Sequence, residues 1–185
     1  MFFLKCPKFV RSLSEVSNDS TTCILMITYR QAISSDAEVL LETRRSAVLG
    51  SHTQAYSRTI LEAWAPAIDA GTIQKESERL LDSDMVTIVA EDGKKIVGLC
   101  TLGISEGLLK QCYVLPEYTG RGIARELVKQ IETITKDHGL QLLRLSSSLI
   151  ARSFYRREGY GELNSYEYDL GNGKQMTCLM MEKLF

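Results

Sequence analysis

The most regular hydrophobic pattern of the chain begins at Ile123. From there to Ile134, apolar residues recur at intervals of three or four, and charged residues occupy most positions between them. This period is that of an amphipathic α-helix with one buried face. Gly139 follows the pattern, and glycine often ends a helix because it adopts a positive φ. The sequence therefore predicts a helix that opens at Ile123 and stops at Gly139.

Apolar runs bounded by turn residues predict seven strands. The clearest pair, 85–90 and 96–102, flanks Asp92-Gly93, a typical hairpin turn. A strand at 108–115 stops at Pro116, and the almost wholly apolar segment 140–145 suits a strand buried on both faces. The other predicted strands are 26–30, 162–170 and 175–183.

Three further helices complete the predicted order. Ser34 or Ser35 would cap a helix that runs to Val48, a second would cover 53–64, and a short one would cover 150–158. The order is strand, two helices, three strands, helix, strand, helix, two strands. It predicts an α/β (α+β) fold with a central mixed, mostly antiparallel sheet of about seven strands and about four flanking helices.

The first 22 residues differ from the rest of the chain. They end in a polar stretch rich in Ser, Thr, Asn and Asp, and regular patterning starts near Cys23. We expect a disordered leader at 1–22, or an over-long start before Met26, and a single domain over 23–185. The alternative is an N-terminal arm docked on the domain.

Composition limits the classes of partner. The chain has 185 residues, 44% of them hydrophobic, and its formal net charge is −1, whereas nucleic-acid binders usually carry a basic excess. The sequence has no run of about 18 apolar residues, so we predict no membrane-spanning helix. The five cysteines show no CxxC spacing, and neither His52 nor His138 belongs to a metal-ligand pattern, so we expect no metal and a reducing, cytoplasmic location.

The candidate chemistry lies directly before the most regular helix. Gly120 and Gly122 lack the Cβ atoms that would keep a ligand away from the first N–H groups of the helix, and Ala124 is small. Those N–H groups have no partner within the helix, and the helix dipole adds positive charge. The turn therefore predicts a pyrophosphate site, to which Arg121 and Arg125 would add charge.

Glycine turns of this kind occur in several folds. A Rossmann turn is disfavoured because no βαβ unit precedes it and the next strand ends at Leu145-Ser146-Ser147 without an acidic residue. A P-loop is excluded because no Gly-Lys-Ser/Thr follows. If only the glycines are considered, the alternative remains that the turn simply begins a helix and binds no ligand.

Two longer motifs carry a family resemblance. Residues 114–124, Val-Leu-Pro-Glu-Tyr-Thr-Gly-Arg-Gly-Ile-Ala, resemble the acyl-CoA-binding motif of the GNAT superfamily of N-acetyltransferases. Residues 148–160 resemble the second motif of that family, in which a helix carries Phe-Tyr and ends at Gly-aromatic. Both motifs stand in the family's order and spacing. There are two departures: Thr119 replaces the usual Gln or Arg, and Ser148 replaces a frequent Asn.

The resemblance implies acetyl-CoA as cosubstrate and an amine as acceptor. The backbone of Cys112, Tyr113 and Val114 would pair with the pantetheine arm. Tyr155 would face the thioester sulfur and donate a hydrogen bond to the leaving thiolate. The remaining implied cofactor-binding residues are Thr119, Gly120, Arg121, Gly122, Ile123, Ala124, Arg125 and Ser148.

The general base and the acceptor stay open at this point. Glu62, Glu91, Glu106 and Glu117 are candidate bases by rough location, and a water-mediated route without a base is an equal alternative. Tyr29, Tyr56 and Trp64 would line the acceptor pocket or simply pack in the core. A nucleophilic Cys112 is disfavoured because no histidine partner is apparent.

Other functions remain as alternatives. The chain could be a catalytically weak module that senses acyl-CoA, or a toxin-like enzyme acting on charged tRNA, which the charge disfavours. A sheet edge could also form a homodimer. The acceptor would be a small-molecule or peptide amine.

Overall fold

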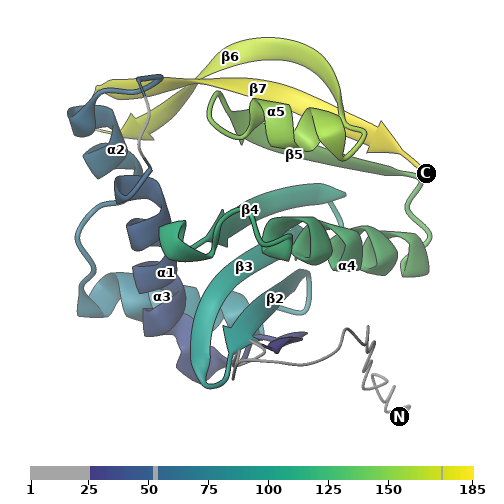
Figure 1. The fold of residues 1–185 in the computed structure, drawn as a ribbon, viewed down its shortest axis with the longest axis horizontal. Helices are drawn as coiled ribbons and strands as arrows, with labels where there is room; N and C mark the ends of the chain where they lie inside the picture. Colours follow the sequence, from purple (N-terminus) through teal and green to yellow (C-terminus); the bar gives the residue numbers. More distant parts are fainter. Residues whose placement is uncertain (1–25, 52–53, 172) are drawn as a thin grey trace, which may run out of the picture.

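The computed structural model describes residues 26–51, 54–171 and 173–185, which form a seven-stranded sheet with helices on both faces (Figure 1). The leader and His52 lie outside the described residues. In spatial order the strands are β1 (Ile27–Gln31), β2 (Met85–Asp92), β3 (Lys95–Gly103), β4 (Leu108–Val114), β5 (Leu142–Ser148), β7 (Lys174–Leu184) and β6 (Gly161–Gly171). The predicted fold class is confirmed.

The sheet has one parallel junction, between β4 and β5. All other neighbouring strands are antiparallel. The β4–β5 ladder consists of two residue pairs, Leu108 with Arg144 and Leu109 with Leu145. The two halves of the sheet are therefore joined at one end of β4 and separate along the rest of it (Figure 1).

One face of the sheet is covered by α4 (Ile123–Asp137) and α5 (Arg152–Arg157). Among the periodic residues of α4, Leu127 and Ile131 are fully buried against the sheet and Ile134 is partly buried. Burying a side chain of this size stabilises the fold by about 1.5–3 kcal/mol relative to exposure. The amphipathic pattern thus fixes α4 on the sheet and sets the position of its N-terminus.

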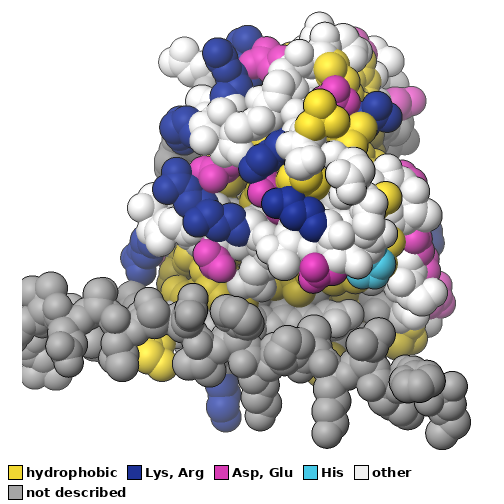
Figure 2. All heavy atoms as spheres, turned by 90° about the vertical axis from the view of Figure 1, so that its right-hand side faces the viewer, with side chains coloured by type: hydrophobic (Ala, Val, Ile, Leu, Met, Phe, Trp, Pro, Cys, Tyr) yellow, Lys and Arg dark blue, Asp and Glu magenta, His cyan; other side chains and the backbone are white. Residues whose placement is uncertain are grey.

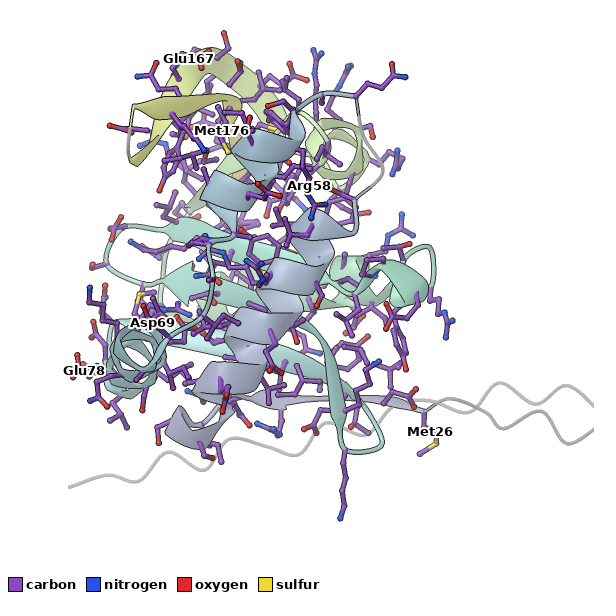
Figure 3. The ribbon with its side chains drawn as sticks, turned by 90° about the vertical axis from the view of Figure 1, so that its left-hand side faces the viewer. Met26, Arg58, Asp69, Glu78, Glu167 and Met176 are labelled. Carbon is purple, nitrogen blue, oxygen red and sulfur yellow. The ribbon has the colours of Figure 1, made fainter. Side chains whose placement is uncertain are left out.

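The opposite face carries α1 (Ala37–Leu49), α2 (Arg58–Trp64) and α3 (Ala70–Leu81). Figure 3 shows α1 lying along this face. The helix α2 lies toward Met176 of β7, and α3, next to the labelled Asp69 and Glu78, lies beside α1. Leu40 of α1 packs with Val89 and Leu99 of the sheet, whereas Leu61 of α2 packs with Met176.

Four predictions about the elements were wrong. The helix α3 was missed, although Asp69 caps it by accepting the Thr72 amide at 2.7 Å. The second helix begins at Arg58 after Ser57, not at residue 53. The strand β5 is buried on one face only, because Arg144 is exposed and pairs with Glu182.

The predicted serine cap of α1 was also wrong. A 3₁₀ turn, η1 (Ser34–Asp36), precedes the helix, and no side-chain hydrogen bond from Ser34 or Ser35 caps it. Instead the Asp36 carboxylate accepts the Ile33 amide at 2.8 Å.

Candidate active site

The opening between β4 and β5 leaves one edge of β4 unpaired. The strand keeps its pairing with β3 as far as Val114, opposite Gly98, but pairs with β5 no further than Leu109. Backbone groups of 110–114 that face β5 consequently have no strand partner within the described chain. Unpaired backbone groups of this kind can accept an extended ligand as an additional strand. Cys112, Tyr113 and Val114, predicted for that role, lie on this stretch.

The glycine turn lies between the end of β4 and the start of α4. A 3₁₀ turn, η2 (Pro116–Tyr118), leads into it. Gly120 and Gly122 have φ of 76° and 80°, values that side chains rarely adopt, and no heavy atom lies within 4 Å of an added Cβ at either position. The sequence uses glycine here because the backbone needs a left-handed conformation.

The N–H groups of this turn are available to a ligand. The first helical hydrogen bond is donated by Glu126 to the Gly122 carbonyl at 3.1 Å. No acceptor among the described residues is found for the N–H groups of 120–125. Ile123 is buried through its side chain and Ala124 is half-buried. The turn therefore presents adjacent free donors at the positive end of a helix.

The polar side chains predicted to surround the turn make local contacts. Thr119 donates its hydroxyl to the Pro116 carbonyl at 2.8 Å. Arg121 donates to the Glu117 carbonyl at 2.8 Å and lies over the Tyr118 ring. These contacts hold Thr119 and Arg121 at the rim of the turn, whereas the backbone N–H groups of the turn stay free.

Arg125 forms an ion pair with a residue at the end of α5, the other helix on this face of the sheet. Its Nε donates to Glu158 Oε1 at 2.9 Å, so the first turn of α4 is tied to the end of α5. Figure 2, a view from the right-hand side of Figure 1, shows Lys and Arg side chains interspersed with acidic ones. On α5, Arg152 is paired with Glu162. An anion at the turn would compete with Glu158 for Arg125.

Ser148 and Tyr155 come from the second motif. Ser148 ends β5, and its Oγ accepts the Ala151 amide at 3.3 Å, which shapes the entry into α5. Tyr155 is 5% exposed and packs in the core between Phe154 and Tyr160, with ring centroids 5.0 and 5.6 Å away. No hydrogen bond to its hydroxyl is found among the described residues.

Tyr155 lies beside the unpaired stretch of β4. Burial raises the pKa of Tyr155 well above its usual range, and electrostatic interaction with Cys112 and Cys100 raises it further. Cys100 lies opposite Cys112 in the β3–β4 ladder. Tyr155 is therefore a neutral phenol at physiological pH, and its hydroxyl is a hydrogen-bond donor without a donated bond inside the described structure.

Two of the three aromatic residues proposed for the acceptor pocket lie together on the opposite face. Tyr56 and Trp64 are 6.2 Å apart, and Trp64 is 6.2 Å from Tyr113 of β4. Two hydrogen bonds fix the Tyr56 hydroxyl. It accepts one from the Leu149 amide at 2.8 Å and donates one to the Thr177 carbonyl at 2.7 Å. Trp64 and Tyr113 are half-buried.

Tyr29 lies elsewhere. It packs against the core on the α4 face, where burial raises its pKa to about 12, with a smaller contribution from Glu126. It therefore does not join Tyr56 and Trp64.

Each of the four candidate bases is held in an ion pair. Glu91 pairs with Arg30 at 2.7 Å, Glu62 with Arg58 at 2.9 Å and Glu117 with Lys95 at 3.0 Å, and Glu106 pairs with Lys110. A carboxylate that is already paired with a cation is a weak proton acceptor. The geometry thus favours none of the four carboxylates as the general base.

Two groups near the site were not predicted from the sequence. One is Arg44 of α1, whose guanidinium lies 5.9 Å from the centroid of the Tyr113 ring. The other is a buried network of Tyr160, Glu132 and Lys183 beneath α5. No local sequence signal marks either group, because the partners are far apart along the chain.

The residues present fit acetyl-CoA. A pyrophosphate needs adjacent donors free of Cβ atoms, which the turn at Gly120 and Gly122 provides. A pantetheine arm needs an unpaired strand edge, which β4 provides. No cluster of metal-ligating side chains is found in the described parts of the chain.

A sheet that opens between two parallel strands beside a glycine turn at a helix N-terminus is the arrangement that the resemblance to acyl-CoA-binding proteins led us to expect. The sequence agrees with the geometry. A family model described as "Acetyltransferase (GNAT) domain" matches residues 52–182. The chain belongs to the GNAT acetyltransferase family.

Solved structures share the fold of this chain. A GCN5-related N-acetyltransferase from Rhodopseudomonas palustris is 25% identical, with a TM-score of 0.77 over 85% of this chain and 95% of that one. The PaiA N-acetyltransferase of Thermoplasma acidophilum, solved with coenzyme A, is 24% identical, with a TM-score of 0.67 over 86% and 99%. YncA of Salmonella typhimurium, a putative acetyltransferase solved with acetyl-CoA, shares the fold at 18% identity, with a TM-score of 0.64 over 86% and 94%.

The sequence search among curated proteins gave no match. None of the described helices is long and apolar enough to cross a membrane.

Proposed function

We propose that the chain is an N-acetyltransferase that moves the acetyl group of acetyl-CoA directly to the amine of a small molecule or peptide. The observation that carries the proposal is the juxtaposition of the unpaired edge of β4, the free N–H groups after Gly120 and the Tyr155 hydroxyl. The free cysteines, Cys100, Cys112 and Cys178, favour a reducing compartment such as the cytoplasm.

Acetyl-CoA supplies an activated thioester. In the transfer, the neutral amine forms a bond to the acetyl carbon, the carbon–sulfur bond breaks, and the amine loses one proton while the CoA sulfur gains one. The chain would hold the pyrophosphate through the N–H groups of 120–125 and the pantetheine arm through β4. Because no candidate carboxylate is free of an ion pair, we propose that water carries the proton away from the amine.

Tyr155 would stabilise the leaving sulfur. It is neutral and its ring is buried, so its hydroxyl is held in place to donate a hydrogen bond to the sulfur. A phenol, with a pKa of about 10, is a weaker acid than a thiol, with a pKa of about 8.5, so donation of a hydrogen bond suffices and full proton transfer is not required.

A sensing module is the second candidate. Thr119 and Ser148, which depart from the family motif, bond to their own turns. Such a module would bind acetyl-CoA without turnover. An acceptor panel read by release of the CoA thiol distinguishes the two functions.

Cofactor binding is tested by thermal unfolding with CoA and acetyl-CoA. At a ligand concentration about 100 times Kd, binding adds about 2.7 kcal/mol to stability. For a chain of this length that raises the Tm by about 5–11 °C. NAD and ATP should give no comparable shift.

The site of binding is tested with a matched pair of variants. Gly122 and Gly139 stand at opposite ends of α4, with φ of 80° and 76°, and neither has a neighbour within 4 Å of an added Cβ. Gly122→Val and Gly139→Val should therefore lose similar stability, but only Gly122→Val should lose the Tm shift with CoA. Equal CoA binding by both folded variants would place the phosphates elsewhere.

A further inference from the structure

Arg44 is a cation without a carboxylate partner on the face opposite α4. Its Nη2 donates to the Trp64 carbonyl at 2.9 Å, and its guanidinium carbon lies 5.9 Å from the centroid of the Tyr113 ring. Its Nε is buried and makes no hydrogen bond. No Asp or Glu among the described residues lies within 4.0 Å of the group.

Two other half-buried arginines of the described chain have carboxylate partners, whereas Arg45, like Arg44, has none within 4.0 Å. Arg79 pairs with Glu76, and Arg30 pairs with both Asp36 and Glu91. A cation removed from water without a counter-ion is costly, and a cation–π contact at an exposed site returns only about 0.5–1 kcal/mol. The surroundings of Arg44 are therefore those of a site completed by an anion.

The hydrogen bond from Arg44 to the end of α2 does not by itself explain why an arginine occupies position 44. The next residue, Arg45, donates to the Ala65 carbonyl at 2.5 Å and so holds the same end of α2. Arg45 lines the outer groove between α1 and the segment after α2, with Ala67 and Ile68, rather than contacting Tyr113. The two neighbours share a capping role and differ in what else they contact.

The position of Arg44 relates it to the reacting atoms. Tyr113 belongs to the unpaired stretch of β4, and its neighbour Cys112 packs on the opposite face, beside Tyr155. Arg44 contacts Tyr113 from α1. The helices α1 and α2 lie on one face of the sheet, whereas the glycine turn lies at the start of α4, which is on the other face (Figures 1 and 3). An acceptor that entered from the α1–α2 side would meet Arg44 close to the acetyl group.

The side chains around Arg44 are apolar and aromatic. The rings of Trp64 and Tyr113 lie 6.2 Å apart, and Tyr56 packs on Trp64. Leu49 and Ile60 pack on the same cluster. These neighbours suit an apolar group beside the anion.

We propose that Arg44 binds the carboxylate of the acceptor, and that the acceptor is an α-amino acid with an apolar side chain. The inference rests on the proposed N-acetyltransferase function. A guanidinium can hold a carboxylate by two parallel hydrogen bonds, which fixes the orientation of the amine as well as its distance. An α-amino acid keeps the amine and the carboxylate on one carbon, which suits the short separation of Arg44 from β4.

The experiment compares matched acceptors. L-phenylalanine and L-leucine are each tested against the amine that lacks the carboxylate, phenethylamine and isopentylamine, with thiol release as the readout. Wild type should acetylate the amino acids with a kcat/KM at least about tenfold higher, as expected for one charge-assisted hydrogen bond. Acetyl-CoA affinity is measured separately by calorimetry.

Arg44→Gln and Arg45→Gln form the matched pair of variants, and Arg44→Lys tests rescue by charge. Arg44→Gln should raise the KM for the amino acids about 10- to 100-fold, with little change for the amines or in the Kd of acetyl-CoA. Arg45→Gln should leave the ratio between amino acid and amine as in wild type. Arg44→Lys should restore part of the preference.

The outcomes separate this inference from the function on which it rests. If acetyl-CoA binds but the amino acids are no better than the amines, or if Arg44→Gln and Arg45→Gln affect both acceptors alike, the carboxylate site is refuted and the cofactor assignment stands. If acetyl-CoA does not bind, the proposed function fails and the acceptor site fails with it. The wild-type comparison decides the matter even if Arg44→Gln does not fold.

Discussion

Removing the Glu132 carboxylate should destabilise the protein markedly. Glu132, on α4, is 8% exposed. Its carboxylate accepts Lys183 Nζ at 2.8 and 2.9 Å and the Tyr160 hydroxyl at 3.0 Å. Lys183 also donates to the Glu158 carbonyl at the end of α5, at 2.9 Å. One carboxylate therefore links α4, α5 and β7.

The magnitude follows from burial. In Glu132→Leu the ammonium of Lys183 loses its counter-ion and Tyr160 loses its acceptor. Breaking a buried ion pair from one side typically costs about 3–5 kcal/mol. Because the Lys183 side chain is 26% exposed and can be partly rehydrated, we expect the lower end, about 3 kcal/mol. In a chain of this length that lowers the Tm by about 6–12 °C.

The assay is a double-mutant cycle read by urea unfolding. Lys183→Met combined with Glu132→Leu removes both charges, so the double variant should be more stable than the sum of the single losses predicts, with a coupling energy of at least about 1 kcal/mol. Tyr160→Phe is the control for the hydroxyl alone and should cost about 1 kcal/mol. A Glu132→Leu loss below about 1 kcal/mol, or additive single losses, would refute the argument from burial.

Three further predictions concern turnover, pH and domain extent. Tyr155→Phe should lower kcat about 100-fold with little change in the Kd of acetyl-CoA, because only a hydrogen bond made in the transition state is lost; an unchanged kcat in steady-state assays would remove Tyr155 from the mechanism. Burial works to raise the pKa of Asp36, but hydrogen bonds from Arg30 and from the Ile33 amide outweigh it and the pKa is lowered. Since the folded pKa lies below the unfolded value of about 3.9, this stabilisation is complete above that pH and is lost as the pH falls below it; urea unfolding should show the loss in wild type and a flatter acid limb in Asp36→Asn. A chain beginning at Met26 should fold and bind CoA as the full chain does, because residues 27–184 contain all seven strands, and an insoluble product would show that the leader contributes to the domain.

The glycine turn and the helix that follows it were predictable because they depend on local sequence. A 3.6-residue period placed the start of α4 at Ile123, and two glycines before it gave free N–H groups without any knowledge of tertiary contacts. The helix α3 was missed for an equally local reason. Its buried Glu76 pairs with Arg79, which interrupts the apolar stripe that marks an amphipathic helix.

The strand β5 shows how pairing overrides pattern. Five of the six residues in 140–145 are uncharged and mostly apolar, which indicated a doubly buried strand. In the structure Arg144 is exposed and pairs with Glu182 on the neighbouring β7, so one face stays open to solvent. The position of Glu182 opposite Arg144 is a matter of register between strands 38 residues apart, and no local window contains it.

The acceptor side depends on the same kind of distant pairing, which explains why the sequence left it open. Arg44 meets Tyr113 across 69 positions of sequence, and the Trp64 carbonyl that holds it comes from a third element. Backbone donors can bind a phosphate whatever side chains surround them, so a short motif suffices to predict that half of the site. The proposed acceptor site consists of side chains that α1, α2 and β4 bring together, and none of them belongs to the glycine turn. If Arg44 binds the acceptor as proposed, two chains with the same turn could acetylate different amines, and the residue at position 44 would say more about the acceptor than the motif that identifies the family.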